Sequence, residues 1–308
     1  MISLNHMFII KNKKIFISIS VLLILFSIIS LFVFPLKIGI DFKGGALTEV
    51  VYTKSRPAQS ELDAVFKTLD IGSVLIQPTG ELGYIVKSPD LNEAEHSLLL
   101  KTLSQDGKSP LEEKNFNSIG PSVGRELTKK AIIAIILVSL GIIAFIAFAF
   151  RKVSRPVASW KYGAMAVVSL LHDALIAAGF FSILCHFWGA EVDTLFVVAI
   201  LTVISLSVSD TIVIFDRIRE NIKGRTGENF SETVGKSLDQ SYMRSIFTSL
   251  TVIIVLLSLV FFGPLSVRYF AMTLTIGMFF GTYSSIFLAS PLIVLIEELQ
   301  IKNKIKKK

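Results

Sequence analysis

Long apolar runs separated by short polar segments dominate this 308-residue chain. Six of the runs reach the ~20 residues that a helix needs to cross a bilayer. They lie at about 15–34, 130–150, 163–186, 194–215, 246–262 and 270–296. Hydrophobic residues make up 52% of the sequence, more than is usual in a soluble domain. The pattern therefore predicts a polytopic α-helical membrane protein with six transmembrane helices.

The segment between the first two runs has shorter stretches of alternating or helical spacing. Strand patterns fall at 46–54, 73–79, 82–88 and 112–120, and helical patterns at 60–70 and 92–105. Their order predicts a ferredoxin-like α+β domain. We therefore expect four parts: the N-terminus with the first transmembrane helix (1–36), the ferredoxin-like domain (37–127), helices two to six (128–296) and a basic tail (297–308).

The net charge of +7 would suggest nucleic acid as a partner of a soluble protein, but here its distribution points to the lipid bilayer. Basic residues gather in two loops, 151–161 and 217–244, and in the tail 302–308. By the positive-inside rule these segments face the cytoplasm, which places both termini there and the ferredoxin-like domain in the periplasm. The first run is longer than a signal-peptide core and lacks a cleavage site, so a retained anchor is favoured over a signal peptide.

The second basic loop contains a stretch, 231–244, that leaves two interpretations open. It is either an amphipathic helix lying along the membrane surface or a solvated connector with some helix.

Asp210 stands inside the fourth apolar run, in the stretch LSVSDTIVIFDRIREN. If that span ends near Asp216, the carboxylate lies ~9 Å inside the interface at 1.5 Å per residue. A carboxylate at mid-helix costs ~2.5–3.5 kcal/mol on insertion scales. A polar flank surrounds it, made of Thr202, Ser205, Ser207, Ser209 and Thr211. A functional role is therefore favoured over the alternative, in which Asp210 only joins helices by a hydrogen bond or ion pair.

Arg244, at the start of the fifth run, is the natural partner for Asp210. The fourth helix runs inward and the fifth outward, so these two positions share a depth, and an arginine stem is long enough to connect neighbouring helices. Thr248 and Ser249 extend the polar flank. An interfacial arginine that only follows the positive-inside rule is an equally open alternative.

Two other polar groups accompany this pair. Asp216 and Arg217 lie at the inner boundary, where helical spacing predicts local ion pairs in preference to a direct role in chemistry. His172 and Asp173 are neighbours in the third run and point ~100° apart on a helix. We therefore expect them not to face each other, and a packing role is favoured over a proton relay.

No pattern in the sequence indicates a cofactor, a metal ion or an enzymatic nucleophile. The segment GIDFKGG (39–45) lacks the ending of a phosphate-binding loop, and its glycines predict a tight turn or a close backbone approach. The single cysteine, Cys185, excludes an intramolecular disulfide. We therefore do not expect an enzyme.

Five segments, in order along the chain, resemble the SecF branch of the SecD/SecF family in the RND superfamily. They are GIDFKGG (with Gly39, Asp41, Gly44 and Gly45), SIGPSVGREL, LLHD, SDTIVIFDRIREN and RSIFTSLT. The resemblance implies a subunit that uses the proton-motive force to assist Sec-dependent protein export across the bacterial inner membrane. The implied partners are SecD in a heterodimer, the SecYEG translocon and the exported preprotein, with YajC and YidC as further candidates.

The family links proton conduction to an aspartate followed by threonine and to an arginine in the fifth span, which correspond here to Asp210 and Arg244. Two positions depart from the family pattern, because Ser209 and Asp239 stand where asparagine is usual. Gly39, Asp41, Gly44 and Gly45 form the family motif at the outer face. Two alternatives remain open: an RND-like proton-coupled efflux unit, which the small outer domain disfavours, and a passive scaffold for the translocon.

Overall fold

The computed structural model describes residues 6–67, 69, 72–149 and 157–306. It divides into two compact units. The bundle unit comprises Met1–Lys37, Ala134–Ala190 and Leu195–Lys308, and the sheet unit comprises Ile38–Ile133 and Glu191–Thr194. Six residues of the first predicted basic loop, 151–156, lie outside the described part of the chain.

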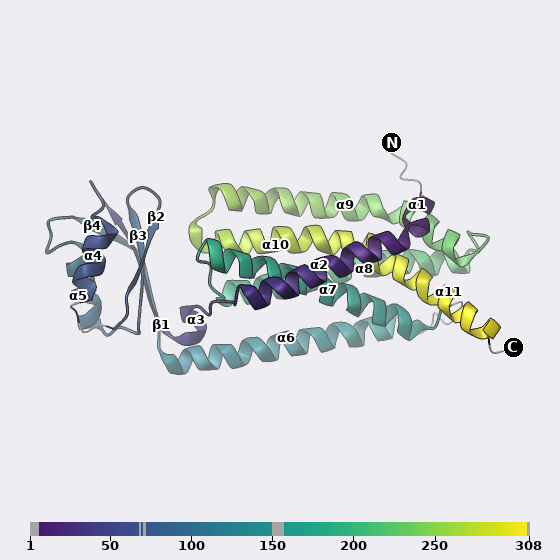
Figure 1. Cartoon of the computed structure of the whole chain (residues 1–308), viewed down its shortest axis with the longest axis horizontal. Helices are drawn as coiled ribbons and strands as arrows, with labels where there is room; N and C mark the ends of the chain where they lie inside the picture. The colour runs from purple at the N-terminus through teal and green to yellow at the C-terminus, as the bar shows by residue number, and fades with distance from the viewer. Residues whose placement is uncertain (1–5, 68, 70–71, 150–156, 307–308) are drawn as a thin grey trace. The chain divides into compact units, whose positions relative to one another are not determined.

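The sheet unit has the predicted ferredoxin-like order of elements. Its strands are β1 (Gly45–Tyr52), β2 (Leu75–Thr79), β3 (Gly83–Ser88) and β4 (Leu111–Ile119). They form one antiparallel sheet in the order β2-β3-β1-β4. The helices are α3 (Ile40–Lys43), α4 (Gln59–Phe66) and α5 (Glu93–Leu103), and α4 and α5 cover one face of the sheet (Figure 1). The prediction of this fold is confirmed.

Alternation along β1 explains how the sheet unit builds its core. Ala46, Val50 and Tyr52 are buried and point to the same face, because side chains of a strand alternate between its two sides. They pack in one cluster with Leu99 and Leu103 of α5. Burying a leucine of this kind contributes ~1.5–3 kcal/mol, so this face sets the register of the central strand.

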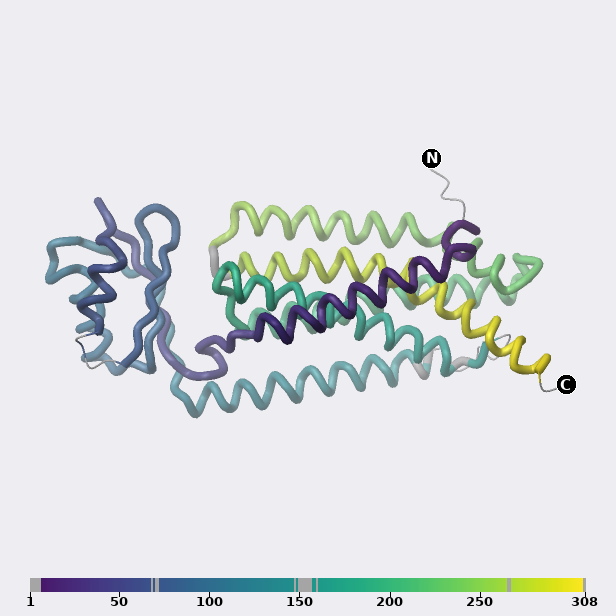
Figure 2. Tube along the Cα trace, viewed as in Figure 1, coloured from purple at the N-terminus to yellow at the C-terminus, as the bar shows by residue number. Residues whose placement is uncertain are grey.

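The bundle unit is built of long helices (Figure 2), which contain most of the apolar length of the chain. Six described helical segments are long and apolar enough to cross a membrane, which confirms the predicted number. The individual helices are α1 (His6–Lys11), α2 (Lys13–Val33), α6 (Pro121–Ala149), α7 (Ser159–Phe187), α8 (Thr194–Lys223), α9 (Phe230–Phe262), α10 (Leu265–Ser284) and α11 (Ser290–Lys306). A π-helical turn, η1 (Ser285–Ala289), joins α10 to α11 within the sixth segment.

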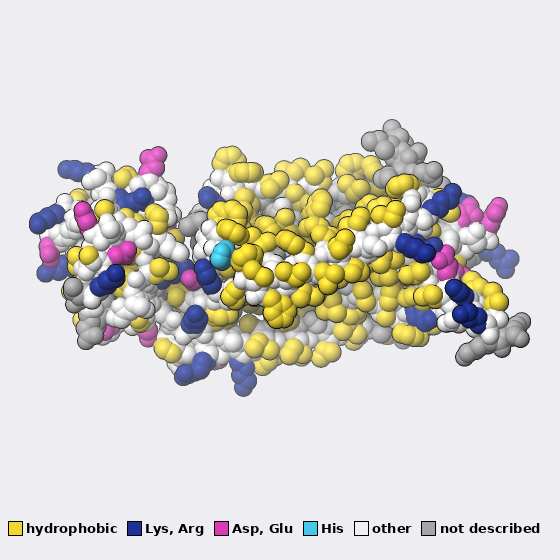
Figure 3. Space-filling view, in the orientation of Figure 1, with side chains coloured by type: hydrophobic (Ala, Val, Ile, Leu, Met, Phe, Trp, Pro, Cys, Tyr) yellow, Lys and Arg dark blue, Asp and Glu magenta, His cyan; other side chains and the backbone are white. Residues whose placement is uncertain are grey.

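The outside of the bundle is apolar. Hydrophobic side chains cover the helices on the face shown in Figure 3, while charged side chains gather near the end of the bundle that carries α11. Phe32 and Phe262 are 85% and 89% exposed. Such surfaces suit the hydrocarbon region of a bilayer, where apolar contact is favourable and exposed backbone is absent because helices satisfy their own hydrogen bonds.

The stretch 231–244 is helical, as one of the two alternatives predicted, but it is neither a separate helix nor a connector. It forms the first turns of α9, in one continuous helix with the fifth span. Likewise α8 continues past Asp216 to Lys223. The two extensions pack as a hairpin, in which Asn221 Nδ2 donates to Ser237 Oγ (2.8 Å) and to Gln240 Oε1 (2.9 Å). Val234 and Leu238 of this extension are buried, and tertiary packing of this kind stabilises the helix.

We predict that Tyr52→Phe destabilises the sheet unit by about 1 kcal/mol, the usual net value of one hydrogen bond. The Tyr52 hydroxyl donates to the carbonyl of Leu103 (2.9 Å), and burial raises the pKa of this phenol from 10.0 to about 12. The neutral phenol therefore stabilises the folded unit fully below pH 10, and this contribution is lost as the pH rises through about 12.

Urea unfolding of the full-length protein in nanodiscs, followed by a fluorophore on the sheet unit, measures this effect. The difference between Tyr52→Phe and the parent protein should be largest at neutral pH and should narrow above pH 10. Identical midpoints at pH 7 would contradict the prediction.

Candidate functional site

Asp210 is half-buried on α8 and faces hydroxyl groups from two other helices. Thr282 Oγ1 of α10 donates to its Oδ2 at 3.4 Å. Ser249 of α9 shares a hydrogen bond with the same threonine. The hydroxyl of Ser245, also on α9, lies beside the carboxylate. The acid therefore points toward protein, and α9 and α10 supply polar groups that offset its desolvation.

Arg244 lies next to this cluster because it directly precedes Ser245 on α9. Within the described residues, however, no ion pair of 4.0 Å or less joins Arg244 and Asp210. The guanidinium instead lies at the wall of a pocket between α8 and α9. The structure thus brings the predicted pair onto facing helices, without direct contact between the two charged groups.

This pocket has a volume of about 270 Å³, and charged and polar side chains make up most of its lining residues. Two of the predicted supporting residues, Asp216 and Arg217, line it together with Arg244. The full lining is Val213, Asp216, Arg217, Glu220, Gln240, Ser241 and Arg244. Local ion pairs were predicted here and are confirmed, since Arg217 binds Glu220 and Arg219 binds Asp216, each at 2.6 Å. A space of this size lined by charged groups can hold several water molecules.

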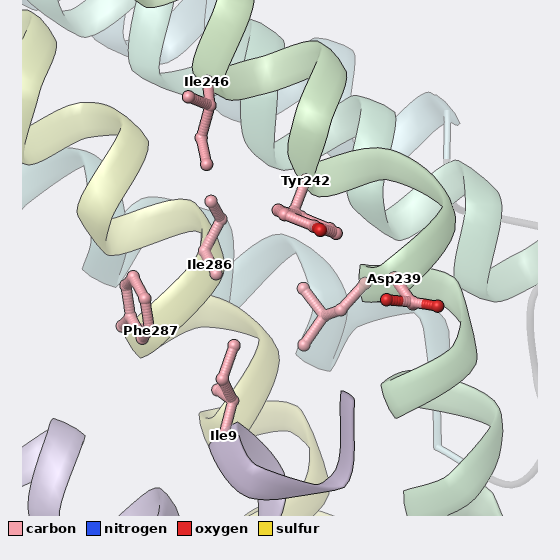
Figure 4. A pocket seen from close by; sticks show the side chains of 7 residues that line it. Ile9, Asp239, Tyr242, Ile246, Ile286 and Phe287 are labelled. Atoms are coloured by element: carbon pink, nitrogen blue, oxygen red, sulfur yellow. The ribbon is translucent and has the colours of Figure 1, made fainter. Parts of the chain in front are cut away.

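The other two predicted supporting residues lie apart from the carboxylate of Asp210. Ser209 is exposed on α8, one residue before Asp210. Asp239 is exposed on α9 and belongs to a different, small pocket of about 30 Å³. In Figure 4 the apolar side chains of Ile9, Ile246 and Ile286 point toward one another, and Asp239 stands at the edge of this group.

A second intramembrane carboxylate, Asp173 on α7, is fully buried in the bundle. His172 Nδ1 lies 2.7 Å from its Oδ1, so the expectation that these neighbours do not face each other is wrong. Two hydroxyls reach its other oxygen, from Ser207 on α8 and from Ser284 on α10 (2.7 Å for the latter). The 100° separation of neighbouring Cβ atoms is overcome because an imidazole and a carboxylate both extend beyond Cβ and can bend toward each other.

Serines inside the apolar runs could have indicated this cluster, although the spacing of apolar residues does not detect them. Ser207 and Ser284 lie in the fourth and sixth runs, and buried hydroxyls are expected to have hydrogen-bond partners. Ser169 donates to Ser284 (2.9 Å), and Thr211 shares a hydrogen bond with Ser285 (2.8 Å). The polar positions of α7, α8 and α10 thus form one buried network.

Two glycines four residues apart allow α10 to approach α8 closely enough for these contacts. A Cβ on Gly277 would lie 2.1 Å from a methyl group of Val203, and one on Gly281 would lie 3.2 Å from the Cβ of Ser207. Small residues at this spacing let membrane helices pack backbone to backbone. The close approach brings Ser284 and Ser285 within hydrogen-bond reach of Asp173 and Thr211.

The segment 39–45 is a compact turn within the sheet unit. The carboxylate of Asp41 accepts hydrogen bonds from the backbone nitrogen (2.8 Å) and the hydroxyl (2.6 Å) of Thr194, the first residue of α8. Gly39 donates its backbone N–H to the carbonyl of Val192 (2.9 Å). The predicted close backbone approach is confirmed at Gly44 and Gly45, which have positive φ and no room for a Cβ beside Pro121 and Ser88.

Within the described residues, no group of three or more His, Cys, Asp and Glu side chains is arranged to hold a metal ion. The carboxylates and the imidazole of the site can each hold a single proton, and the hydroxyls around them can donate and accept hydrogen bonds. Fold and site together define a polytopic α-helical membrane protein with carboxylates enclosed at helix contacts.

Comparison with known proteins gives the family. A model of the C-terminal region of the protein export membrane proteins SecD/SecF matches residues 99–299. The chain is 43% identical over 296 residues to the protein translocase subunit SecF of Thermobaculum terrenum, across 93% of this chain and 92% of that protein. The chain belongs to the SecD/SecF family of protein export membrane proteins, as the motifs predicted.

Larger relatives contain this fold as a part. The chain is 35% identical to the protein translocase subunit SecDF of Bacillus subtilis, across 91% of this chain but 37% of that protein. The crystal structure of SecDF from Thermus thermophilus, a translocon-associated membrane protein, matches with a TM-score of 0.78 at 28% identity. That match covers 94% of this chain and 38% of the SecDF chain, so the present chain spans less than half the length of these two relatives.

We predict that Gly277→Ala destabilises the bundle by about 1–3 kcal/mol, the range for overpacking a filled contact. The new methyl group would overlap Val203 and force α10 away from α8. Gly141→Ala on α6 is the matched control, since nothing lies within 4 Å of its added Cβ. Thermal unfolding in detergent should show a lower midpoint for the first variant only, and equal midpoints would contradict close packing at Gly277.

We predict that Asp41→Ala weakens the start of α8 by about 0.5–2 kcal/mol, as for the loss of a helix N-cap. The variant leaves the backbone nitrogen and hydroxyl of Thr194 without their acceptor. Hydrogen exchange at the first turn of α8 in the full-length protein would show the effect as faster exchange. Glu112→Ala, which removes only an exposed partner of Lys114, should leave that turn unchanged, and similar rates in both variants would argue against capping by Asp41.

Proposed function

We propose that this chain is the SecF-type subunit of a proton-driven export complex, in which Asp210 binds and releases protons in transit and Arg244 controls its charge. The complex assists Sec-dependent protein export across the bacterial inner membrane. The observation that supports this most directly is the position of Asp210: half-buried, bound by Thr282, and beside Arg244 at a polar pocket.

The separation of the two charged groups suits a switch between two states. Contact with a guanidinium favours the charged carboxylate, whereas loss of that contact and desolvation favour the protonated acid. Two packings of α8 and α9 that differ in this contact therefore bind the proton with different affinity, and a proton gradient biases which one is populated. One elementary charge crossing the membrane is worth ~2.3 kcal/mol per 100 mV, enough to shift such an equilibrium more than tenfold.

The polar pocket gives the proton access from one end of α8. Asp216 and Arg217 line it, and we assign them the role of keeping it hydrated and electrostatically balanced. Ser209 and Asp239 have a smaller, modulating role, because neither contacts the Asp210 carboxylate. The segment with Gly39, Asp41, Gly44 and Gly45 positions the start of α8, the helix that carries Asp210.

The orientation and the partners follow from charge and from the larger relatives. Basic residues near the α8–α9 turn and in α11 support an orientation with that end and both termini in the cytoplasm and the ferredoxin-like domain 37–127 in the periplasm. Because SecDF proteins extend well beyond the region matched here, we assign SecD as the partner in the membrane. The SecYEG translocon, the emerging preprotein, YajC and YidC are the further partners of this assembly. No enzymatic step is part of the proposal.

We predict that Asp210→Asn abolishes proton flux in vesicles that contain the complex and reduces export in cells to the level of a deletion strain. An amide cannot bind and release a proton at this position, while its size preserves packing. Arg244→Gln should also reduce flux, since the carboxylate loses the charge that favours its ionised form.

Ser258→Ala is the matched control on α9, because its hydroxyl bonds only to the carbonyl of Val255 in its own helix. It should keep both flux and export. If Asp210→Asn inserts, assembles and still conducts protons at the parent rate, Asp210 has no role in proton passage and the proposal fails.

A further inference from the structure

The environment of Asp173 differs from that of an acid that only joins helices. The side chains of Asp173 and His172 have no exposed surface, and within the described residues His172 Nε2 has no hydrogen-bond partner. Asp173 accepts from His172 Nδ1 on one oxygen and from Ser207 and Ser284 on the other. The imidazole therefore has one nitrogen committed to the carboxylate and one nitrogen free to take a proton.

The charge of this pair depends on one proton. A neutral imidazole beside an ionised carboxylate carries a charge of −1, and one added proton, on either residue, makes the pair neutral. Of the described groups that face it, α8 contributes Ser207 and α10 contributes Ser284, while Tyr283 stacks on His172 at 6.4 Å. From α2, the helix packed on the other side of α7, Ser30 reaches α7 only at Gly179 and Ser182, farther along.

None of these facing groups carries a fixed opposite charge, which distinguishes this pair from Asp210 with Arg244. Burying a net charge costs several kcal/mol even after relaxation. Protonation of the pair therefore changes the free energy of the packed arrangement of α7, α8 and α10.

Two helices touch both carboxylates. On α8, Asp210 itself lies three residues after Ser207, which binds Asp173. On α10, Thr282 binds Asp210 and Ser284 binds Asp173. Any shift of α8 against α10 must change the hydrogen bonds of both acids together, because the close packing at Gly277 and Gly281 leaves no side-chain layer between the two helices to absorb it.

We propose that Asp173, paired with His172, is a second proton-binding site of this chain, coupled through α8 and α10 to Asp210. The inference rests on the proposed function, because it assigns a further residue pair to the same proton-driven cycle. Binding of a proton at one site changes the affinity of the other by the same factor in both directions.

Proton flux through the complex in vesicles, measured across a pH series with a trapped dye, tests this coupling. Asp173→Asn and His172→Gln should each shift the midpoint of the flux profile by about one pH unit, a tenfold change in affinity within the range of coupled sites. Ser182→Ala is the control. Ser182 lies on α7, the same helix as Asp173, and the variant removes its buried hydrogen bond to Ser30 of α2. It should leave the midpoint of the flux profile unchanged.

A second measurement tests the inference even if Asp173→Asn assembles poorly. Infrared difference spectra of the full-length protein in lipid, recorded between two pH values, should show a carboxyl signal from Asp173 whose position changes in His172→Gln. Flux profiles and spectra of His172→Gln that superimpose on those of the parent protein would overturn the inference.

The two proposals fail in different ways. Flux that survives Asp210→Asn refutes the proposed function. Flux that is lost in Asp210→Asn but keeps the parent midpoint in Asp173→Asn and His172→Gln refutes only the second site.

Discussion

The close contact between α8 and α10 is the constraint on which the polar interior of this bundle depends. Gly277 and Gly281 remove the side-chain layer that normally separates two helices, so Ser207 and Ser284 meet around Asp173. Thr211 and Ser285 meet one turn further along. Lipid gives no hydrophobic drive for helix association, so packing of small residues and hydrogen bonds between helices have to provide it. In this bundle, α8 and α10 contribute both the packing of small residues and hydrogen bonds between helices.

The same contact determines how the two carboxylates differ. Asp173 is sealed at the junction of three helices and has a histidine as its partner. Asp210 is only half-buried and accepts a hydrogen bond from Thr282, and Arg244 lines a pocket nearby between α8 and α9. One acid is thus fully buried and the other is partly exposed. Environment, and not residue type, separates their chemistry.

The periodicity of the sequence was sufficient for the six spans and for the ferredoxin-like domain, because each depends on local spacing of apolar residues. It also placed Asp210 and Arg244 on adjacent antiparallel helices, since depth follows from distance along the chain. Contacts that depend on side-chain bending or on the rotation of one helix against another could not be predicted in this way. His172 with Asp173 is the clearest case, and the separation of Arg244 from Asp210 is another.

The extension of α9 was missed for a related reason. The stretch 231–244 is polar on one side, and its spacing alone does not distinguish a membrane surface from the flank of α8 as the place where its apolar side packs. The hydrogen bonds from Asn221 to Ser237 and Gln240 hold this stretch of α9 against the flank of α8. A single asparagine at a helix crossing carries little periodic signal, although it decides which surface the helix covers.

The π-helical turn η1 accommodates one residue more than an α-helix of the same length would. Side chains after it are therefore rotated about the helix axis by about 100° relative to their positions in an unbroken α-helix. The hydroxyls of Thr282 and Ser284 lie before the turn, whereas Glu298, which pairs with Lys13 at 2.7 Å, lies after it. The direction in which side chains point is therefore different before and after the turn, so the two ends of the sixth span can contact different neighbours.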